Sequence, residues 1–238
     1  HYGPERIVVA LAGSFAQADV DSLRARFSAM EARPLPPSPP GRYTPAVTVK
    51  RKAIEQNHLT LAFPGLPFAD ERRFTLQLLS SILGGGMSSR LFQQVREQRG
   101  LCYSIYSYGT CHDDTGYFGV YTALGRETEG AALETVFSVI RDFAEHGVTE
   151  DELSRAREQS KANVLMGLES TQSRMSSLGR GALLVGRVLD EDEVIARYDA
   201  VTREDVRRLA QELFQFQNAS LSAVGRVGSA DAYRELLQ

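Results

Sequence analysis

An arginine and a tyrosine seven residues apart, Arg96 and Tyr103, are the pair in this sequence whose types and spacing could do chemistry. Arg96 ends a predicted helix and Tyr103 lies in the predicted strand that follows, so both occupy one helix-to-strand corner. A guanidinium group can hold a peptide carbonyl or terminus, and a phenol can donate a hydrogen bond to a developing oxyanion. The structural alternative is that Arg96 pairs with Glu97 or Asp113 and that Tyr103 packs half-buried on its strand.

Three consecutive glycines, Gly84, Gly85 and Gly86, separate this helix from another predicted helix before it. Because glycine has no Cβ atom, such a turn permits positive φ angles and the close approach of another chain. We therefore expect the three glycines to contact a bound substrate. No lysine of a phosphate-binding loop follows them, which argues against a nucleotide site.

Tyrosines are dense in the hairpin predicted after Arg96. Tyr106 and Tyr108 lie on its first strand, and Tyr117 and Tyr121 lie on its second. Aromatic side chains offer broad contact area to a peptide that adds to a sheet, so these residues could line a peptide-binding wall, and we assign Tyr106 to substrate binding. Core or cross-strand packing explains each tyrosine equally well.

The histidines do not predict a metal site in this chain. There are four of them, and no two have the i, i+4 spacing that places imidazoles on one helix face. His146 stands beside Gly147 at a predicted helix end, where an imidazolium is stabilised by the helix dipole. Neither a Gly-x-Ser-x-Gly elbow nor a cysteine with a positioned histidine is present, so no nucleophilic centre is predicted.

The composition is that of a globular protein. The chain has 238 residues, of which 42% are hydrophobic and 24% charged, and a net charge of −3. This balance argues against nucleic acid or an anionic membrane as a partner, and no apolar run is long enough to span a bilayer. The first residues contain neither a starting methionine nor a signal-peptide pattern, so we expect a piece of a longer protein.

The two cysteines are expected to be thiols. Cys102 and Cys111 fall in one predicted strand, and nine residues of extended chain hold their Cα atoms too far apart for a disulfide. Two thiols favour a reducing compartment, which we take to be the cytoplasm.

Hydrophobic periodicity and capping signals predict a chain of strands and helices. Capping boxes begin helices at Thr149 and Thr202. We predict helices over 18–30, 70–83, 89–98, 129–145, 150–168, 171–184, 191–198, 203–214 and 230–237, and strands over 6–12, 47–51, 58–63, 101–111, 116–124 and 219–224.

Residues 33–46 are proline-rich and predict an extended connector. The segments that flank the rest of the chain resemble each other. An apolar strand closed by Gly13 has an aspartate six residues later, and a strand closed by Gly225 has the same spacing to Asp231. If this is a repeat, the chain begins with the tail of one unit and continues with a whole second unit. Coincidence is the alternative, since strand, glycine and helix often follow one another.

Residues 83–108 resemble the signature of the C-terminal homologous half of pitrilysin/insulinase-family zinc peptidases, close to the mitochondrial processing peptidase branch. That signature is a glycine-rich turn, Ser-Arg-Leu, a helix ending in Arg, and Gly-Leu-x-Tyr with the Tyr seven residues after the Arg. The resemblance extends over nearly the whole chain, through residues 56–59, the hairpin turn at 114–116 and the helix starts at Thr149 and Thr202.

The resemblance implies an α+β fold of two layers, with a mostly antiparallel sheet packed on one side by helices. Residues 1–32 would be a strand and helix remaining from the preceding homologous half, 33–46 a linker, and 47–238 the C-terminal domain. In this family the two halves enclose a chamber. The first half carries zinc on a His-x-x-Glu-His motif, which is missing here, and the second contributes an Arg and a Tyr to the substrate, here Arg96 and Tyr103.

The function implied is therefore that of the half of a zinc metalloendopeptidase that does not bind zinc. It would be inactive alone, with zinc in the N-terminal half of the parent protein. Its partners would be that half, a peptide substrate and a second subunit in a homo- or heterodimer. Two other functions stay open: half of a non-catalytic partner or scaffold subunit of the same family, and a peptide-binding module.

Overall fold

The computed structural model describes residues 2–32, 34, 36–37 and 39–238. The chain divides into two compact units. The first consists of residues 1–40 and 161–196, and the second of residues 41–160 and 197–238. The second unit contains the sheet and every residue that we single out for substrate contact.

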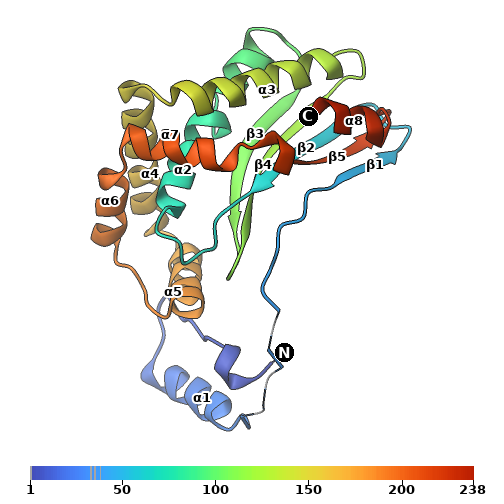
Figure 1. The fold of residues 1–238 in the computed structure, drawn as a ribbon. Coiled ribbons are helices and arrows are strands. Elements are labelled where there is room, and N and C mark those ends of the chain that lie inside the picture. Colours follow the sequence, from blue (N-terminus) through green and yellow to red (C-terminus); the bar gives the residue numbers. More distant parts are fainter. Residues whose placement is uncertain (1, 33, 35, 38) are drawn as a thin grey trace. The chain divides into compact units, whose positions relative to one another are not determined.

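A five-stranded mixed sheet is the centre of the second unit (Figure 1). Its strand order is β1-β5-β2-β4-β3, and only the β1/β5 pair is parallel. The predicted α+β fold with a mostly antiparallel sheet is confirmed. The strands are β1 (Val47–Arg51), β2 (Asn57–Pro64), β3 (Ser104–Cys111), β4 (Gly116–Leu124) and β5 (Ser220–Gly225).

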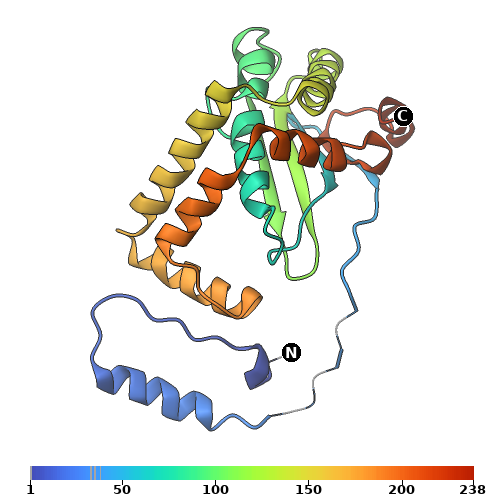
Figure 2. The ribbon, with the colours of Figure 1, turned by 60° about the vertical axis from the view of Figure 1, so that its left-hand side comes forward.

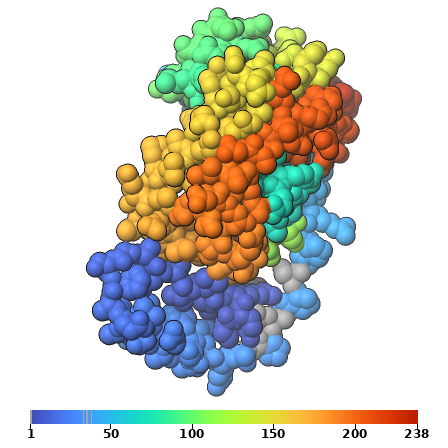
Figure 3. Space-filling model, turned by 90° about the vertical axis from the view of Figure 1, so that its left-hand side faces the viewer, coloured from blue at the N-terminus to red at the C-terminus, as the bar shows by residue number. Residues whose placement is uncertain are grey.

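Helices cover one face of this sheet (Figure 2). Along β2 every second residue is buried, as the alternation of a strand with one covered face requires. Phe63 and Phe118 from the sheet meet Phe143 and Phe214 from the helical side in the core. The helices are α2 (Arg73–Gly84), α3 (Glu129–His146), α4 (Glu150–Gly167), α6 (Glu191–Ala200), α7 (Arg203–Leu213) and α8 (Ala230–Leu236), of which α4 and α6 extend into the first unit. Figure 3 shows the second unit from the side of its helices, with the start of α4 in yellow and α7 in orange-red.

Both predicted capping boxes are confirmed at the starts of α4 and α7. The backbone N–H of Glu152 donates to the Thr149 hydroxyl, and its carboxylate accepts from the Thr149 N–H. Asp205 and Thr202 exchange the same two bonds. Each box satisfies N–H groups that a helix start leaves without partners.

The first unit contains a short 3₁₀ turn (Pro4–Arg6), α1 (Gln17–Ser28) and α5 (Thr171–Val185), together with the end of α4 and most of α6. The predicted helix over 18–30 is confirmed by α1. The predicted strand over 6–12 is wrong for this chain, because residues 7–12 belong to no strand. A strand exists only when it pairs, and no described segment pairs with these residues.

The proline-rich connector contains no helix or strand at its described positions. Arg33, Leu35 and Ser38 of this predicted linker lie outside the described residues. Its far end is anchored in the second unit, where the Tyr43 hydroxyl donates to the Ala62 carbonyl at 2.8 Å. Within the described residues, no helix combines the length and apolarity that crossing a bilayer requires.

Candidate functional site

The helix that carries Arg96 is π-helical over Phe92–Glu97, where an ordinary helix over 89–98 was predicted. The N–H of Gln98 donates to the carbonyl of Gln93, five residues back, at 2.9 Å. π-Helical turns are rare, and they occur often at functional sites. This wider turn sets the direction in which Arg96 leaves the helix.

Gly100 turns the chain from this helix towards the sheet. Its φ is +61°, and its N–H donates to the Arg96 carbonyl at 3.0 Å, which closes the helix in the manner typical of a C-terminal glycine. Three residues later the N–H of Tyr103 donates to the carbonyl of Ala123 at 2.8 Å, at the entry to β3. The backbone on both sides of the corner is therefore fixed by hydrogen bonds.

The corner brings Arg96 and Tyr103 together. The guanidinium carbon lies 5.9 Å from the centre of the Tyr103 ring and 4.7 Å from that of Phe92. Tyr103 is 70% exposed, so it is not the half-buried packing residue of the structural alternative. Arg96 and Glu97 approach only to 4.0 Å, at the limit of an ion pair. The two polar groups thus stand at the surface, positioned mainly by stacking.

Phe92, whose ring lies against the Arg96 guanidinium, was not predicted as part of the site. The i, i+4 spacing of Phe92 and Arg96 on one helix face was the signal that could have revealed it. Val95, on the same turn, is fully buried and anchors the turn in the core.

The tyrosines form a continuous row on the face of the sheet opposite the helices. Tyr106 lies directly across from Tyr121, with ring centres 4.9 Å apart, and Tyr108 links Tyr106 to Tyr117 at 5.9 and 6.0 Å. The Tyr121 hydroxyl shares a hydrogen bond of 2.7 Å with Nδ1 of His58. Cross-strand packing is therefore confirmed, and a peptide-binding wall stays a prediction.

Two phenols of this row have a raised pKa. Burial raises the pKa of Tyr108 and of Tyr121, and the neighbouring Tyr106 raises the pKa of both further. They are hydrogen-bond donors at neutral pH and not anions. Tyr106 itself is 46% exposed and is the member of the row most open to a ligand.

The three glycines have different environments. None has a positive φ, so that part of the expectation is wrong. A Cβ atom on Gly84 would lie 2.5 Å from the backbone nitrogen of Ser107, and one on Gly85 would lie 2.6 Å from Cα of Ser81, whereas one on Gly86 would meet nothing within 4 Å. The chain that approaches Gly84 is therefore β3 of the same protein. Substrate contact stays a prediction for all three, and Gly86 is the most accessible for it.

Arg90 links the start of this helix to the junction between α3 and α4 through hydrogen bonds. This role was not predicted from the sequence. Its guanidinium donates to both carboxylate oxygens of Glu152 at 2.7 and 2.8 Å and to the carbonyl of Gly147 at 2.8 Å. It also stacks on Phe143, with 4.9 Å to the ring centre. This largely buried arginine orients the segment that presents Arg96.

The same ion pair makes stability depend on pH. Partial burial alone would raise the pKa of Glu152, but the hydrogen bonds from Arg90 and Thr149 outweigh burial and lower the pKa to about 2. A depressed carboxyl pKa gives stability that is fully present above the unfolded value, near 4.5, and is lost as the pH falls towards 2. We expect this pair to account for about 1–2 kcal/mol of the stability lost over that range, after allowance for solvent screening.

The measurement is urea denaturation of the chain and of Glu152→Gln between pH 6 and pH 2.5. The variant should start less stable, and its stability should fall less steeply with acid. Equal slopes for the two proteins would assign the acid sensitivity to other carboxylates.

The part of the chain that the structure describes contains no group of three or more potential metal ligands. His58 is engaged with Tyr121, and His146 pairs with Asp142 at 3.0 Å on α3. Both cysteines are thiols and not disulfide partners, as predicted, and burial raises the pKa of Cys102.

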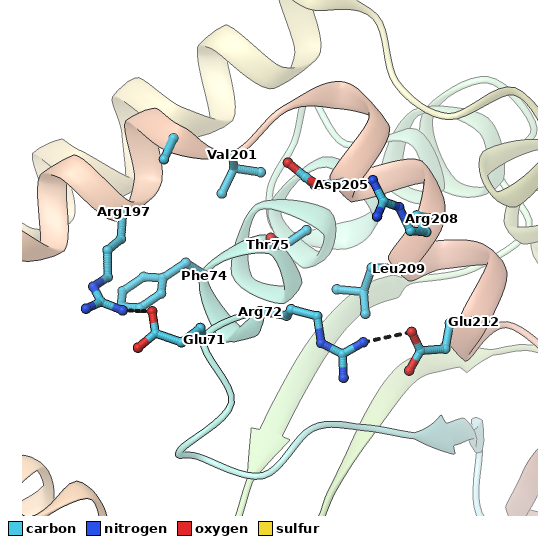
Figure 4. A pocket seen from close by; sticks show the side chains of 11 residues that line it. Glu71, Arg72, Phe74, Thr75, Arg197, Val201, Asp205, Arg208, Leu209 and Glu212 are labelled. Atoms are coloured by element: carbon cyan, nitrogen blue, oxygen red, sulfur yellow. Dashed lines mark hydrogen bonds and ion pairs between the residues drawn. The ribbon is translucent and has the colours of Figure 1, made fainter.

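A hollow of about 300 Å³ lies on the helical side, between the start of α2 and helices α6 and α7 (Figure 4). Its charges pair with one another: Arg72 donates to Glu212 at 2.7 Å, and Arg197 pairs with Glu71. Since these partners already neutralise one another, the hollow presents no unmatched charge to a ligand. This hollow therefore does not compete with the Arg96 corner as a candidate site.

Known proteins resemble this chain in sequence and in structure. The family described as the peptidase M16 inactive domain matches residues 1–160. An uncharacterized zinc protease of Streptomyces coelicolor is 38% identical over 98% of this chain and 53% of its own length, and the uncharacterized zinc protease YmxG of Bacillus subtilis is 37% identical over 90% and 53%. The chain thus spans about half the length of the curated relatives it matches.

Solved structures share the fold. A peptidase M16 inactive domain from Pseudomonas fluorescens has a TM-score of 0.77 at 22% identity, over 90% of this chain and 52% of that one. A chain of complex III2 from Candida albicans has a TM-score of 0.79 at 17% identity, over 94% and 57%. At these identities the likeness shows the fold alone.

Proposed function

Because the chain belongs to the peptidase M16 inactive-domain family, we propose that it is the half of a zinc metalloendopeptidase that binds no metal and closes the chamber around a peptide substrate. The names of its relatives, which are called zinc proteases, support the reaction class. Zinc would be held by the half of the parent protein that this chain does not span, and the isolated chain would be inactive. We further propose the cytoplasm as its compartment, since two thiols favour a reducing one.

In this proposal Arg96 and Tyr103 contact the substrate. The observation that carries it is their juxtaposition: a guanidinium and a phenol, both solvent-facing, on a corner whose backbone is fixed on each side. The arginine would hold a peptide carbonyl by charge-assisted hydrogen bonds, and the tyrosine would donate a hydrogen bond to the carbonyl oxygen as negative charge develops there. Because the side chains are placed before the substrate arrives, little ordering cost remains for the reaction.

The sheet would hold the rest of the peptide. Among the described residues, strand β3 is at the sheet edge and pairs with β4, and an edge can accept an extended peptide as an added strand. Tyr106 lies on this edge strand, and Gly86 provides open space in the turn before the π-helix. Both are proposed to contact the substrate, together with Gly84 and Gly85 as parts of the same turn.

The test is peptide hydrolysis by the parent protein with Arg96→Ala and with Tyr103→Phe. Each change should lower kcat/KM by roughly 100- to 1,000-fold, which is typical for removal of one donor to a developing oxyanion. Arg96→Lys should restore little, because an ammonium cannot reproduce the planar fork of guanidinium. The melting temperature should not change in any of these variants, since both side chains are exposed.

Two controls separate a local effect from a general loss of charge or of a phenol. Arg208→Ala removes an exposed arginine from the helical side, and Tyr2→Phe removes the hydroxyl of an exposed tyrosine in the first unit. Both should retain full activity. If the parent cleaves peptides and all five variants are equally active, the proposed substrate contact by Arg96 and Tyr103 is wrong.

A non-catalytic partner or scaffold subunit is the second candidate, because the fold also matches a chain of complex III2 from Candida albicans. A parent protein without peptidase activity, alone or with its natural partner, would favour this candidate. Retained peptide binding without cleavage would instead favour a peptide-binding module.

A further inference from the structure

The sheet has an open face, opposite the helices, whose residues follow from the strand register. Directly paired residues of neighbouring strands lie on the same face of a sheet, and successive residues of one strand alternate between the faces. One line of paired residues crosses all five strands of this face: Tyr106, Tyr121, Thr60, Ser222 and Thr48. Each of the five carries a hydroxyl group and none is buried, so we call this line the hydroxyl row.

A second line of paired residues lies beside the hydroxyl row, at the end of the sheet nearer to the Arg96 corner. It consists of Ser104, Ala123, His58, Val224 and Lys50. The N–H of Tyr103 donates to the carbonyl of Ala123, so this line adjoins the corner directly. Its other end is Lys50, an exposed cation on the outer strand β1.

The charge on this face has one sign. The chain contains 30 aspartates and glutamates, but none of the five strands, all of which the structure describes, contains either residue. Acidic side chains occur only in the turns beyond the strand ends, at Glu55 and at residues 113–114. One of these, Asp114, already accepts the N–H of Gly41 at 2.5 Å. The fixed charges at the two sides of the open face are therefore the cations Lys50 and Arg96.

The hydroxyl row can donate to a ligand. Within the described part of the chain, the hydroxyls of Thr48, Thr60 and Ser222 have no hydrogen-bond partner. A hydroxyl can donate as well as accept, so these groups alone do not select the sign of a ligand's charge. The selection comes from the two cations and from the lack of a carboxylate among the strands.

We propose that the open face selects peptides with acidic side chains, whose carboxylates accept hydrogen bonds from the hydroxyl row and lie near Lys50 and Arg96. A lysine or arginine of a substrate would lose water here without gaining a carboxylate partner. This inference rests on the proposed function in taking a peptide as the ligand, and it adds the class of peptide.

The dimensions of the sheet indicate where the acidic residues of the substrate should be. Four strand spacings of about 4.8 Å separate β3 from β1, and an extended chain advances about 3.3 Å per residue. A substrate that continues from the β3 edge across the face thus covers it with about six residues. Acidic residues within that distance of the edge-bound segment should matter, and more distant ones should not.

Peptide binding to the intact parent protein tests the proposal. Two fluorescent peptides of the same sequence carry either glutamates or lysines at the positions that flank a neutral centre, and anisotropy gives their Kd values. We expect the glutamate peptide to bind roughly tenfold more tightly at low salt, and salt should reduce this ratio because it screens exposed charges. Equal affinities would overturn the proposal. So would tighter binding of the lysine peptide, which would mean that the tyrosine rings hold cations.

Neighbouring residues of β1 provide matched variants. Lys50→Gln removes the cation of the open face, whereas Arg51→Gln removes a cation from the opposite face of the same strand. We expect Lys50→Gln to weaken binding of the glutamate peptide by about threefold, as for loss of one exposed ion pair, and Arg51→Gln to leave it unchanged. Equal effects of the two variants would show that general charge, and not this face, selects the peptide.

An added carboxylate gives a second pair of variants. Ser222→Asp places an acid in the hydroxyl row, and Ser154→Asp places one on the exposed side of α4. Only Ser222→Asp should lower the preference for the glutamate peptide, by about fivefold, because like charges repel. Melting temperatures establish that both variants are folded, and the Lys50 variant decides the matter if Ser222→Asp is not.

Binding and cleavage separate this inference from the proposed function. Selective binding of the glutamate peptide by a parent that cleaves neither peptide would support the inference and contradict the enzymatic role. Cleavage of both peptides, bound with equal affinity, would support the enzymatic role and overturn the inference.

Discussion

Replacing Arg90 by alanine is expected to lower the free energy of unfolding of the chain by about 3–4 kcal/mol. The Arg90 and Glu152 side chains are only 16% and 19% exposed, so the substitution leaves a carboxylate with little water and without its main partner. It also removes the donor to the Gly147 carbonyl and the stacking on Phe143. Urea denaturation at pH 7 measures the change.

Arg207 provides the matched control for this loss. It makes an equally bidentate pair with Glu204, at 2.9 Å for both bonds, but the pair is more exposed, and only the stem of Arg207 lies against Gly147. Arg207→Gln keeps the stem and removes the charge, and it should not change stability measurably, because exposed pairs contribute little. If the two arginine variants unfold at the same urea concentration, burial of the Arg90 pair is not what stabilises this region.

Gly84→Ala is expected to destabilise the chain by about 3 kcal/mol, the upper end for overpacking of a core. The added methyl group would meet the backbone of Ser107, which cannot move aside as a flexible side chain would. Helix α2 and strand β3 must therefore separate, and the buried contact between the Ser80 and Ser107 hydroxyls would be strained with them. Thermal or urea unfolding of the variant measures the effect.

Gly86→Ala is the control within the same triplet. Its Cβ atom meets nothing, and its φ is not positive, so alanine fits and the stability should change by less than about 0.5 kcal/mol. Equal losses at positions 84 and 86 would show that chain flexibility, and not close packing, is what the glycines provide. An activity loss in the parent for Gly86→Ala without a stability loss would support substrate contact at the turn.

Local patterns predicted most of the fold of the second unit. The alternation in residues 58–63 predicted β2 with one covered face, and the two threonine capping boxes predicted the starts of α4 and α7. These features depend on residues within a few positions of each other, which is why the sequence alone reveals them. The order of the strands was not predicted, because the family resemblance implied only a mostly antiparallel sheet.

The parts that the sequence did not predict depend on distant residues. The strand over 6–12 has the right composition but lacks partners in this chain, and pairing, not propensity, decides whether a strand forms. Gly84 is explained by the backbone of Ser107, and Arg90 by Glu152, in each case across more than twenty residues of sequence. At the candidate site, the sequence predicted that Arg96 and Tyr103 share a helix-to-strand corner, but it did not predict the stacking of Arg96 on Phe92.

The π-helical turn at Phe92–Glu97 determines the direction in which the Arg96 side chain points, in addition to its distance along the sequence from Tyr103. Consecutive side chains on a helix are rotated by about 100°, so the extra residue that a π turn accommodates rotates everything after it by that amount relative to an unbroken α-helix. A relative that lacked one residue in this turn could keep both the arginine and the tyrosine, and its guanidinium would still point in a different direction. In such proteins, an arginine and a tyrosine at this spacing are therefore a weaker sign of the proposed substrate contact than the π-helical turn that orients the arginine.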